Sequence, residues 1–97
     1  MASIDIIWDL DDDPDGNVQH IAEHGVTPRE VEEVIFNPES NTATSRSSEN
    51  RITFGYTSAG RYLAIVWEHV LDDTLMIYPV TAYDAPEPGR AKTRRNK

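Results

Sequence analysis

The stretch NVQHIAEHGVTPREVEEVIFNP, residues 17–38, decides the fold because it predicts two short helices joined at a glycine. Asn17 is a suitable N-cap, since its side-chain oxygen can accept hydrogen bonds from the free N–H groups of the first turn. Gly25 suits the left-handed position that ends the first helix. Thr27 and Glu30 match a capping box, with a proline at the first position of the second helix. We expect that helix to end at the Asn-Pro pair.

The segments on both sides of this stretch predict β-strands. The apolar, β-branched residues 4–8 indicate a first strand, and period-two alternation predicts strands at 51–57, 61–69 and 75–82. The polar segment 41–48 is compatible with a short edge strand or with a mobile loop. Pro79 places the last strand at an edge or at a bulge, because proline cannot donate to a ladder. The expected fold class is α+β, an antiparallel meander with two short helices packed on one face.

The register of the central hairpin decides which side chains meet. A two-residue loop at 59–60 sets Arg51 opposite Glu68 and turns Phe54 toward the helices. If the second turn also has two residues, Tyr83 lies on the same exposed face as Arg51 and Glu68. A shift of one residue would exchange the two faces, because side chains alternate along a strand.

The charge of the chain is unevenly distributed. Its 97 residues carry a formal net charge of −8, and their number predicts one domain at 1–85. Residues 1–85 hold 16 acidic residues, four arginines and no lysine, whereas the tail 86–97 is basic and predicted to be disordered. The acidic body repels phosphates, so any RNA contact must use a local basic spot or the tail. A basic protein partner is the simpler expectation.

The sequence also limits the compartment and the chemistry. It has no cysteine, so disulfides and thiolate metal sites are excluded. The longest apolar run, residues 63–67, is too short to span a membrane, and no secretory signal opens the chain. We therefore expect a cytoplasmic protein without membrane contact.

An acidic loop precedes the first helix and partly matches a calcium-binding pattern. Asp11, Asp13 and Asp15 fall at positions 1, 3 and 5 of an EF-hand-type loop. The closing bidentate acid is missing, because position 12 is Ala22. A solvated turn that favours the positive end of the helix is the alternative that we prefer.

Two histidines on the first predicted helix share one face. His20 and His24 are four residues apart, which is a spacing that can begin a zinc site. Zinc needs further ligands, and only Glu23 and His69 are evident candidates. We prefer a polar helix face, and we expect neither a metal nor another cofactor.

Four residues could form a site for metal-free RNA cleavage. That reaction needs a base, an acid and a cation for the phosphorane. Arg51 is the candidate cation, Glu68 or Tyr83 the candidate base, and His69 the candidate acid. The alternative is a structural Arg51–Glu68 pair worth about 0.2–1 kcal/mol.

Several blocks between Trp8 and Tyr83 carry a family resemblance. They are Trp8-Asp9, Asn17, His24-Gly25-Val26-Thr27, Phe36-Asn37-Pro38, Arg51–Gly55, Gly60–Trp67 and Thr81-Ala82. In their order and spacing they resemble the BrnT family of bacterial toxin-antitoxin systems. The resemblance implies a RelE-like fold, similar to the RelE and ParE toxins, with metal-independent ribonuclease activity and an antitoxin as partner.

The chain departs from that family pattern at two places. Tyr83 stands where BrnT proteins typically carry an arginine, and Gln19, His20 and Glu23 occupy a usually basic helix. Two functions are therefore expected. The first is a toxin with ribonuclease activity, for which RNA is a candidate ligand. The alternative is a non-catalytic acidic protein-interaction module with the same fold, bound to an antitoxin or another protein.

Overall fold

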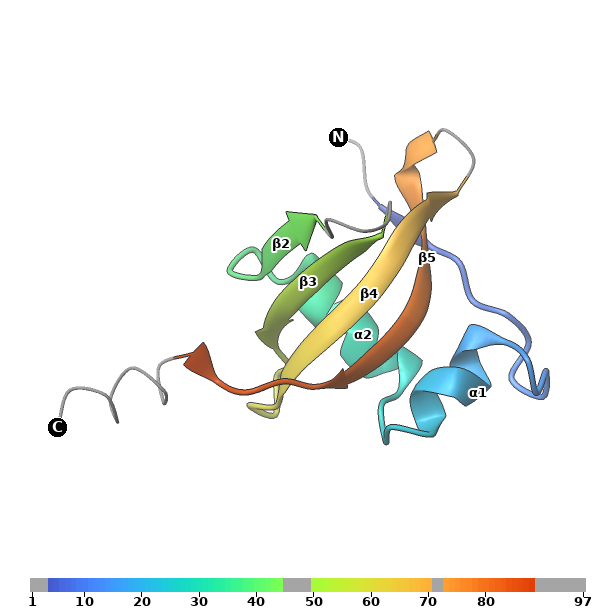
Figure 1. The fold of residues 1–97 in the computed structure, drawn as a ribbon, viewed down its shortest axis with the longest axis horizontal. Coiled ribbons are helices and arrows are strands. Elements are labelled where there is room, and N and C mark those ends of the chain that lie inside the picture. The colour runs from blue at the N-terminus through green and yellow to red at the C-terminus, as the bar shows by residue number, and fades with distance from the viewer. Residues whose placement is uncertain (1–3, 45–49, 71–72, 89–97) are drawn as a thin grey trace, which may run out of the picture.

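The computed structural model describes residues 4–44, 50–70 and 73–88 (Figure 1). Its elements are β1 (Asp5–Ile6), α1 (Asn17–Ala22), α2 (Pro28–Phe36), β2 (Asn41–Thr44), β3 (Arg51–Tyr56), β4 (Tyr62–Val70) and β5 (Asp73–Asp84). The sheet has the strand order β1-β5-β4-β3-β2. Of the predicted basic tail, residues 89–97 lie outside the described residues, as do residues 45–48 of the polar segment.

The sheet is mixed. Strands β2 to β5 pair antiparallel with their neighbours, as expected for a meander. β1, however, pairs parallel with β5, with Ile6 opposite Ile77. The predicted α+β class with two helices is confirmed, and the purely antiparallel sheet is wrong in this respect. The sequence pattern of a short first strand does not indicate which strand it will join, or in which direction.

The joint between the two helices follows the sequence prediction. Thr27 Oγ1 accepts a hydrogen bond from the Glu30 N–H at 3.2 Å, and Glu30 Oε1 accepts one from the Thr27 N–H at 3.0 Å. This capping box fixes the start of α2. Gly25 has φ 73°, the left-handed conformation predicted after the first helix. The N-cap prediction for α1 is wrong, because Gly16 holds that position and Asn17 is the first helical residue.

The predicted register of the β3–β4 hairpin is wrong by one residue. The strands are joined by three residues, Ser58–Gly60, and not by two. Gly60 has φ 89°, which is typical of the last residue of a three-residue hairpin loop. The additional loop residue moves the pairing, so that Phe54 lies opposite Ala64 and not opposite Ile65.

This shift exchanges the two faces of β3. The small or polar residues Thr53 and Gly55 face the helices, and Phe54 faces away from them. The reason is the close approach of α2 and of the residues that follow it. A Cβ added at Gly55 would lie 2.9 Å from Ser40 Cβ and 3.1 Å from Val34 Cγ1, so a larger side chain could not fit without displacement.

The hydrophobic core lies between the helices and strands β4 and β5. Its buried members are Ile21, Val26, Val31, Val34, Leu63, Ile65 and Ala82, with Trp8, Ile35 and Trp67 packed against them. Burial of each large aliphatic side chain contributes about 1.5–3 kcal/mol. The Trp67 indole N–H donates to Thr53 Oγ1 at 2.8 Å, so the polar atom that it brings into the core has a partner.

A β-bulge in β5 accommodates its proline. Val66 lies opposite Thr81, whereas Trp67 lies opposite Pro79, so one additional residue is inserted in β5. β5 is an interior strand between β1 and β4. Of the two predicted placements for Pro79, the bulge is therefore confirmed.

Neither α1 nor α2, the helices of the described part, has the length and apolar character that a membrane span requires.

Candidate functional site

The sheet separates the four predicted catalytic residues. Arg51 lies opposite Trp67, on the face that the helices cover. Glu68 follows Trp67 directly, so its side chain points to the other face, because side chains alternate along a strand. Arg51 and Glu68 are therefore not the cross-strand neighbours that the sequence predicted.

His69 and Tyr83 are divided in the same way. His69 lies on the side of Trp67, with ring centroids 5.2 Å apart, and its Nδ1 is buried without a hydrogen-bond partner in the described structure. Tyr83 lies on the opposite face, across from Ala64. Ala64 and Glu68 are four residues apart on β4, a separation of about 13 Å. The geometry thus gathers no base, acid and cation around one point.

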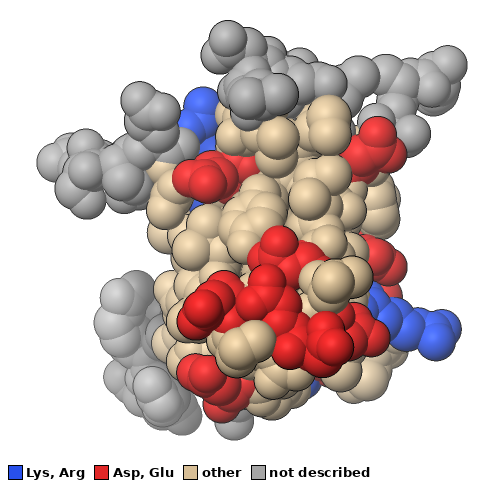
Figure 2. Space-filling view, turned by 90° about the vertical axis from the view of Figure 1, so that its right-hand side faces the viewer, with Lys and Arg blue, Asp and Glu red and all other residues tan. Residues whose placement is uncertain are grey.

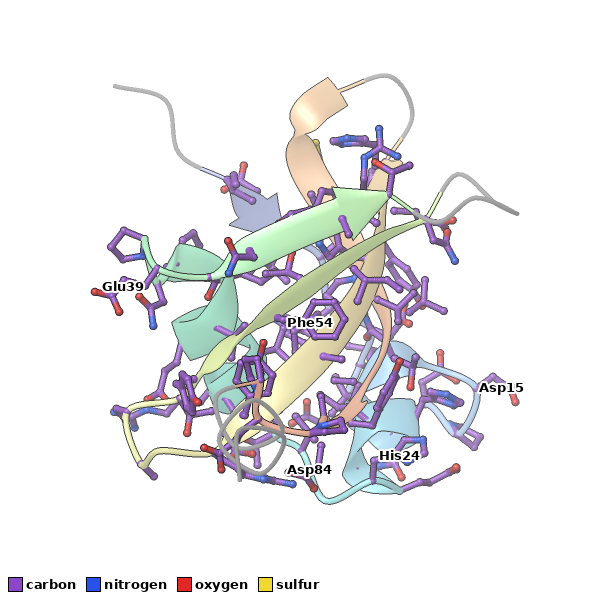
Figure 3. The ribbon with its side chains drawn as sticks, turned by 60° about the vertical axis from the view of Figure 1, so that its left-hand side comes forward. Asp15, His24, Glu39, Phe54 and Asp84 are labelled. Atoms are coloured by element: carbon purple, nitrogen blue, oxygen red, sulfur yellow. The ribbon has the colours of Figure 1, made fainter. Side chains whose placement is uncertain are left out.

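The face of the sheet that points away from the helices is apolar and aromatic. We call it the open face. Figure 3 shows Phe54 on this side of the sheet. Its central residues are Ile52, Phe54 and Tyr56 of β3, Tyr62, Ala64 and Val66 of β4, and Thr81 and Tyr83 of β5. None of these eight side chains carries a charge, and Thr81, whose buried hydroxyl has no hydrogen-bond partner in the described structure, is the polar residue that is not aromatic.

Ring contacts hold the aromatic side chains of the open face together. The rings of Phe54 and Tyr62 are stacked, with centroids 6.3 Å apart and an interplanar angle of 16°. Tyr56 contacts Tyr62 at 4.8 Å. Tyr56 is 41% exposed and Tyr83 39%, so both present ring surface to solvent. Such pairs contribute about 0.5–1.5 kcal/mol beyond burial, so these rings form a preorganised surface.

Carboxylates flank the open face at both of its ends. At one end, the Tyr56 hydroxyl donates to Glu87 at 3.2 Å, and partial burial together with this bond raises the pKa of Tyr56. At the other end, Tyr78 lies opposite Glu68 and its hydroxyl donates to Asp9 at 2.5 Å. The bond to Asp9 raises the pKa of Tyr78 to about 12. Both tyrosines therefore stay neutral near pH 7.

Helix α1 connects the open face to an acidic side of the molecule. The rings of His24 and Tyr83 lie 6.4 Å apart, and those of His20 and His24 5.9 Å apart. Figure 2 shows carboxylates gathered on the side formed by α1 and the loop before it. The exposed acidic residues of these two segments are Asp11, Asp12, Asp15 and Glu23.

The two candidate metal segments do not assemble a site. Asp13 Oδ1 accepts a hydrogen bond from the Asp15 N–H at 3.0 Å, which is a local turn within the loop. Within residues 4–44, 50–70 and 73–88, no three His, Asp or Glu side chains are grouped so that they could hold a metal ion. His20 and His24 are exposed and contact each other edge to face.

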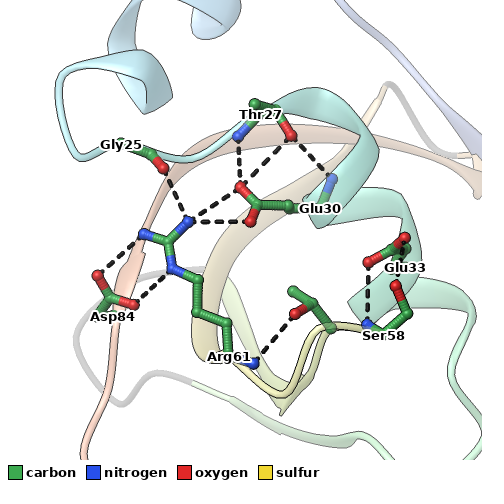
Figure 4. A network of polar contacts seen from close by, with 8 residues as sticks. Gly25, Thr27, Glu30, Glu33, Ser58, Arg61 and Asp84 are labelled. Carbon is green, nitrogen blue, oxygen red and sulfur yellow. Dashed lines mark hydrogen bonds and ion pairs between the residues drawn. The ribbon is translucent and has the colours of Figure 1, made fainter.

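Arg61 connects the joint between the helices, α2 and the end of β5 through its guanidinium group (Figure 4). Nη1 donates to the Gly25 carbonyl at 2.8 Å and to both Glu30 carboxylate oxygens at 3.0 Å. Nε and Nη2 donate to the two oxygens of Asp84 at 2.9 and 3.0 Å. The contacts with Asp84 and Glu30 raise the pKa of Arg61 above its already high usual value. A guanidinium engaged in this way joins the helix joint to the end of β5 and is not available for a phosphate.

Asn17 connects the loop before α1 to the sheet. Its Nδ2 donates to the carbonyl oxygens of Ile7 and Pro79, both at 3.0 Å. Its Oδ1 accepts from the Asp9 N–H at 3.0 Å, and its own N–H donates to Asp9 Oδ2 at 2.9 Å. The sequence indicated Asn17 only as an N-cap and did not single out Arg61, because Pro79 lies 62 residues from Asn17 and Gly25 lies 36 residues from Arg61.

Three carboxyl groups should make the fold sensitive to acid. Hydrogen bonds hold the pKa of each carboxyl group below its usual range. Asp9 accepts from the Tyr78 hydroxyl and from the Asn17 N–H. Glu33 accepts from the Ser58 N–H and hydroxyl, and Asp84 accepts from Arg61. Groups with a depressed pKa bind fewer protons in the folded state, so unfolding takes up protons in acid. Their contribution to the free energy of unfolding is complete above the ordinary pKa values, 3.8 for Asp and 4.5 for Glu. It is lost as the pH falls through the lower pKa values of the folded state.

We therefore expect the midpoint of thermal unfolding to fall as the pH drops below about 4. Circular-dichroism melts between about pH 6 and pH 2.5 measure this. Asp84→Asn should show a lower midpoint at pH 6 and a shallower decline in acid. A midpoint that stays constant down to about pH 3 would contradict the expectation.

Comparison with known proteins assigns the chain to no family and gives it no function. No model of a known protein family matches the sequence, and no curated protein shows significant similarity to it. The resemblance to BrnT proteins therefore stays a prediction. The function has to be argued from the charge, the geometry and the surfaces of the chain itself.

Proposed function

We propose that this protein is a non-catalytic, acidic interaction module that binds a basic protein partner. The observation that carries the proposal is its charge. The described residues include fifteen acidic side chains and three arginines. Arg61 pairs with Glu30 and Asp84, and Arg29 lies 3.8 Å from Glu33. The surface therefore offers an excess of carboxylates, which attract a cationic partner and accelerate its association.

The same charge disfavours RNA as the ligand. Binding of nucleic acid depends on Lys and Arg that neutralise phosphates and release counterions. The separation of Arg51 from Glu68 by the sheet is a second argument against ribonuclease chemistry. Without a cation beside the base, the developing charge on the phosphorane has no stabilising partner.

A toxin with ribonuclease activity is the second candidate, and the resemblance to BrnT proteins favours it. Three of the residues that carry the resemblance, Asn17, Thr27 and Arg61, make contacts that hold the fold. The resemblance therefore supports a shared RelE-like architecture more strongly than it supports a shared chemistry. The interaction module that we propose therefore has a RelE-like architecture.

Expression of the chain alone in a bacterium tests the proposal. We expect no slowing of growth, and no cleavage when the purified protein is incubated with RNA. The product of a gene adjacent to its own, if basic, should co-purify after co-expression and dissociate as salt rises from about 50 to about 500 mM.

Growth arrest or RNA cleavage that Arg51→Ala or Glu68→Ala relieves would support the toxin instead. Arg29→Ala is the matched control for Arg51→Ala, because the Arg29 side chain is 86% exposed and its removal changes the net charge equally. Arrest that survives both substitutions would place a catalytic site elsewhere, and would equally overturn the proposal.

A further inference from the structure

We propose that the open face is the docking surface, and that its occupant is a basic amphipathic segment of a partner protein. Apolar side chains of that segment would lie on the aromatic rings, and its Lys and Arg side chains would meet the flanking carboxylates. This inference rests on the proposed function and adds the location of the site and the chemistry of the partner. Two independent properties of the open face carry it, its apolar centre and its acidic ends.

The apolar centre is suited to burial by another chain. Both described helices pack on the opposite side of the sheet, so Tyr56 and Tyr83 keep about two fifths of their surface exposed, at 41% and 39%. Tyrosine supplies a large contact area at little entropic cost and is enriched among residues that dominate binding energy. Ala64, between Phe54 and Tyr83, is fully buried, so the neighbouring rings form a closed layer.

The acidic ends determine the charge of the occupant. Glu87 contacts Tyr56 at one end, and Glu68 and Asp9 lie beside Tyr78 at the other. The acidic side of α1 continues from His24, next to Tyr83. A cation that approaches a tyrosine face is also attracted by the ring itself.

The described arginines do not offset these acids on the open face. Arg29 belongs to α2, on the other side of the sheet, and Arg61 is engaged with Glu30 and Asp84. Arg51 shares the helix-covered face with Trp67. The open face therefore combines an apolar centre with a negative potential, to which a cationic amphipathic segment is complementary.

Other occupants fit less well. Single-stranded nucleic acid also stacks on aromatic side chains, but it needs a positively charged groove along its backbone. A second copy of this chain would bring two acidic rims together, and like charges across an interface cost several kcal/mol. A cationic protein segment is therefore the occupant that fits the open face best.

The test uses the full-length, isotope-labelled protein and three synthetic peptides of equal length. The first combines leucine and lysine in an amphipathic order, the second combines serine and lysine, and the third combines leucine and glutamate. We expect the leucine–lysine peptide to shift the backbone amide signals of β3, β4 and the end of β5 on the open face. It should bind at least about tenfold more tightly than the serine–lysine peptide, and the leucine–glutamate peptide should not bind.

Matched variants separate the open face from the rest of the surface. Tyr56→Ser combined with Tyr83→Ser should weaken binding of the leucine–lysine peptide about tenfold. Phe36→Ser, which removes a 54% exposed ring from α2, should change it less than about twofold. Glu68→Gln should weaken binding, whereas Glu39→Gln, at an exposed position beyond α2, should not. Unfolding midpoints confirm that each variant is folded.

The possible failures are distinguishable. If both lysine peptides bind equally and the double tyrosine variant has no effect, the docking surface is wrong and the acidic module still stands. If neither the leucine–lysine peptide nor the serine–lysine peptide binds, the proposed acidic interaction module is wrong as well. Concentration-dependent shifts of the open face without peptide would identify a second copy as the occupant, and shifts caused by an RNA oligonucleotide would identify nucleic acid. Either result would overturn the inference.

Discussion

Replacement of Asn17 by alanine should lower the free energy of unfolding by about 3–5 kcal/mol, the largest effect that we expect from one substitution. Asn17 is 2% exposed, and its side chain satisfies the carbonyl oxygens of Ile7 and Pro79 and the N–H of Asp9. Removal of the amide takes the partner from the buried Pro79 carbonyl, at a cost of about 1–3 kcal/mol, and from two partly buried groups at a smaller cost each. Urea unfolding followed by tryptophan fluorescence measures the loss.

Asn17→Asp is the sharper form of this experiment, because it keeps the shape and exchanges donors for acceptors. A carboxylate cannot donate to two carbonyl oxygens, and it would add a charge beside Asp9. We expect Asn17→Asp to be at least as destabilising as Asn17→Ala near pH 7. Asn41→Ala, at an exposed position in β2, is the matched control and should change stability by less than about 0.5 kcal/mol. Equal effects at positions 17 and 41 would refute the role of the network.

Replacement of Arg61 by alanine should cost about 2–3 kcal/mol. Its guanidinium joins Gly25 and Glu30 of the helix joint to Asp84 at the end of β5. Solvent screening weakens these ion pairs, since the side chains of Arg61 and Asp84 are 29% and 62% exposed. The expected consequence is a looser joint between α1 and α2, visible as faster amide hydrogen exchange near Gly25.

Two further variants separate the geometry of this contact from its charge. Arg61→Lys keeps the charge but cannot form the two-pronged contact with Asp84, so it should recover less than about half of the loss. Arg29→Ala removes the same charge from an 86% exposed side chain and should cost less than about 0.5 kcal/mol. A full recovery by lysine would mean that net charge, and not the contact geometry, holds the joint.

The features that the sequence predicted correctly are those that depend on near neighbours. The capping box joins Thr27 to Glu30, three residues away, and Gly25 takes the left-handed conformation because it has no Cβ. Alternation likewise indicated strands β3, β4 and β5. Turn, cap and strand preferences act over a few residues, so they can be recognised in the sequence without knowledge of the rest of the molecule.

The residues of the open face could not be predicted in the same way. The pattern of large apolar residues in β3 is equally consistent with either face, and one additional loop residue reversed the choice. The deciding contacts are made against Gly55 by Val34 of α2 and by Ser40, which lies between α2 and β2. Small residues face the helices there because the helix lies close, which turns Phe54 toward solvent. The exchanged faces of β3 separate Arg51 from Glu68 and bring the aromatic residues of the open face together as a candidate docking surface.

The sequence by itself determined the acidic charge of the protein, the helix joint and the strands of the α+β class. The tertiary structure alone decided the parallel pairing of β1, the hairpin register and the contacts of Asn17 and Arg61. Asn17 reaches Pro79 across 62 residues, and Arg61 reaches Gly25 across 36. Such contacts form only after distant segments have been brought together by burial of the core. No local preference at either residue encodes its partner, so the partner becomes known only from the folded chain.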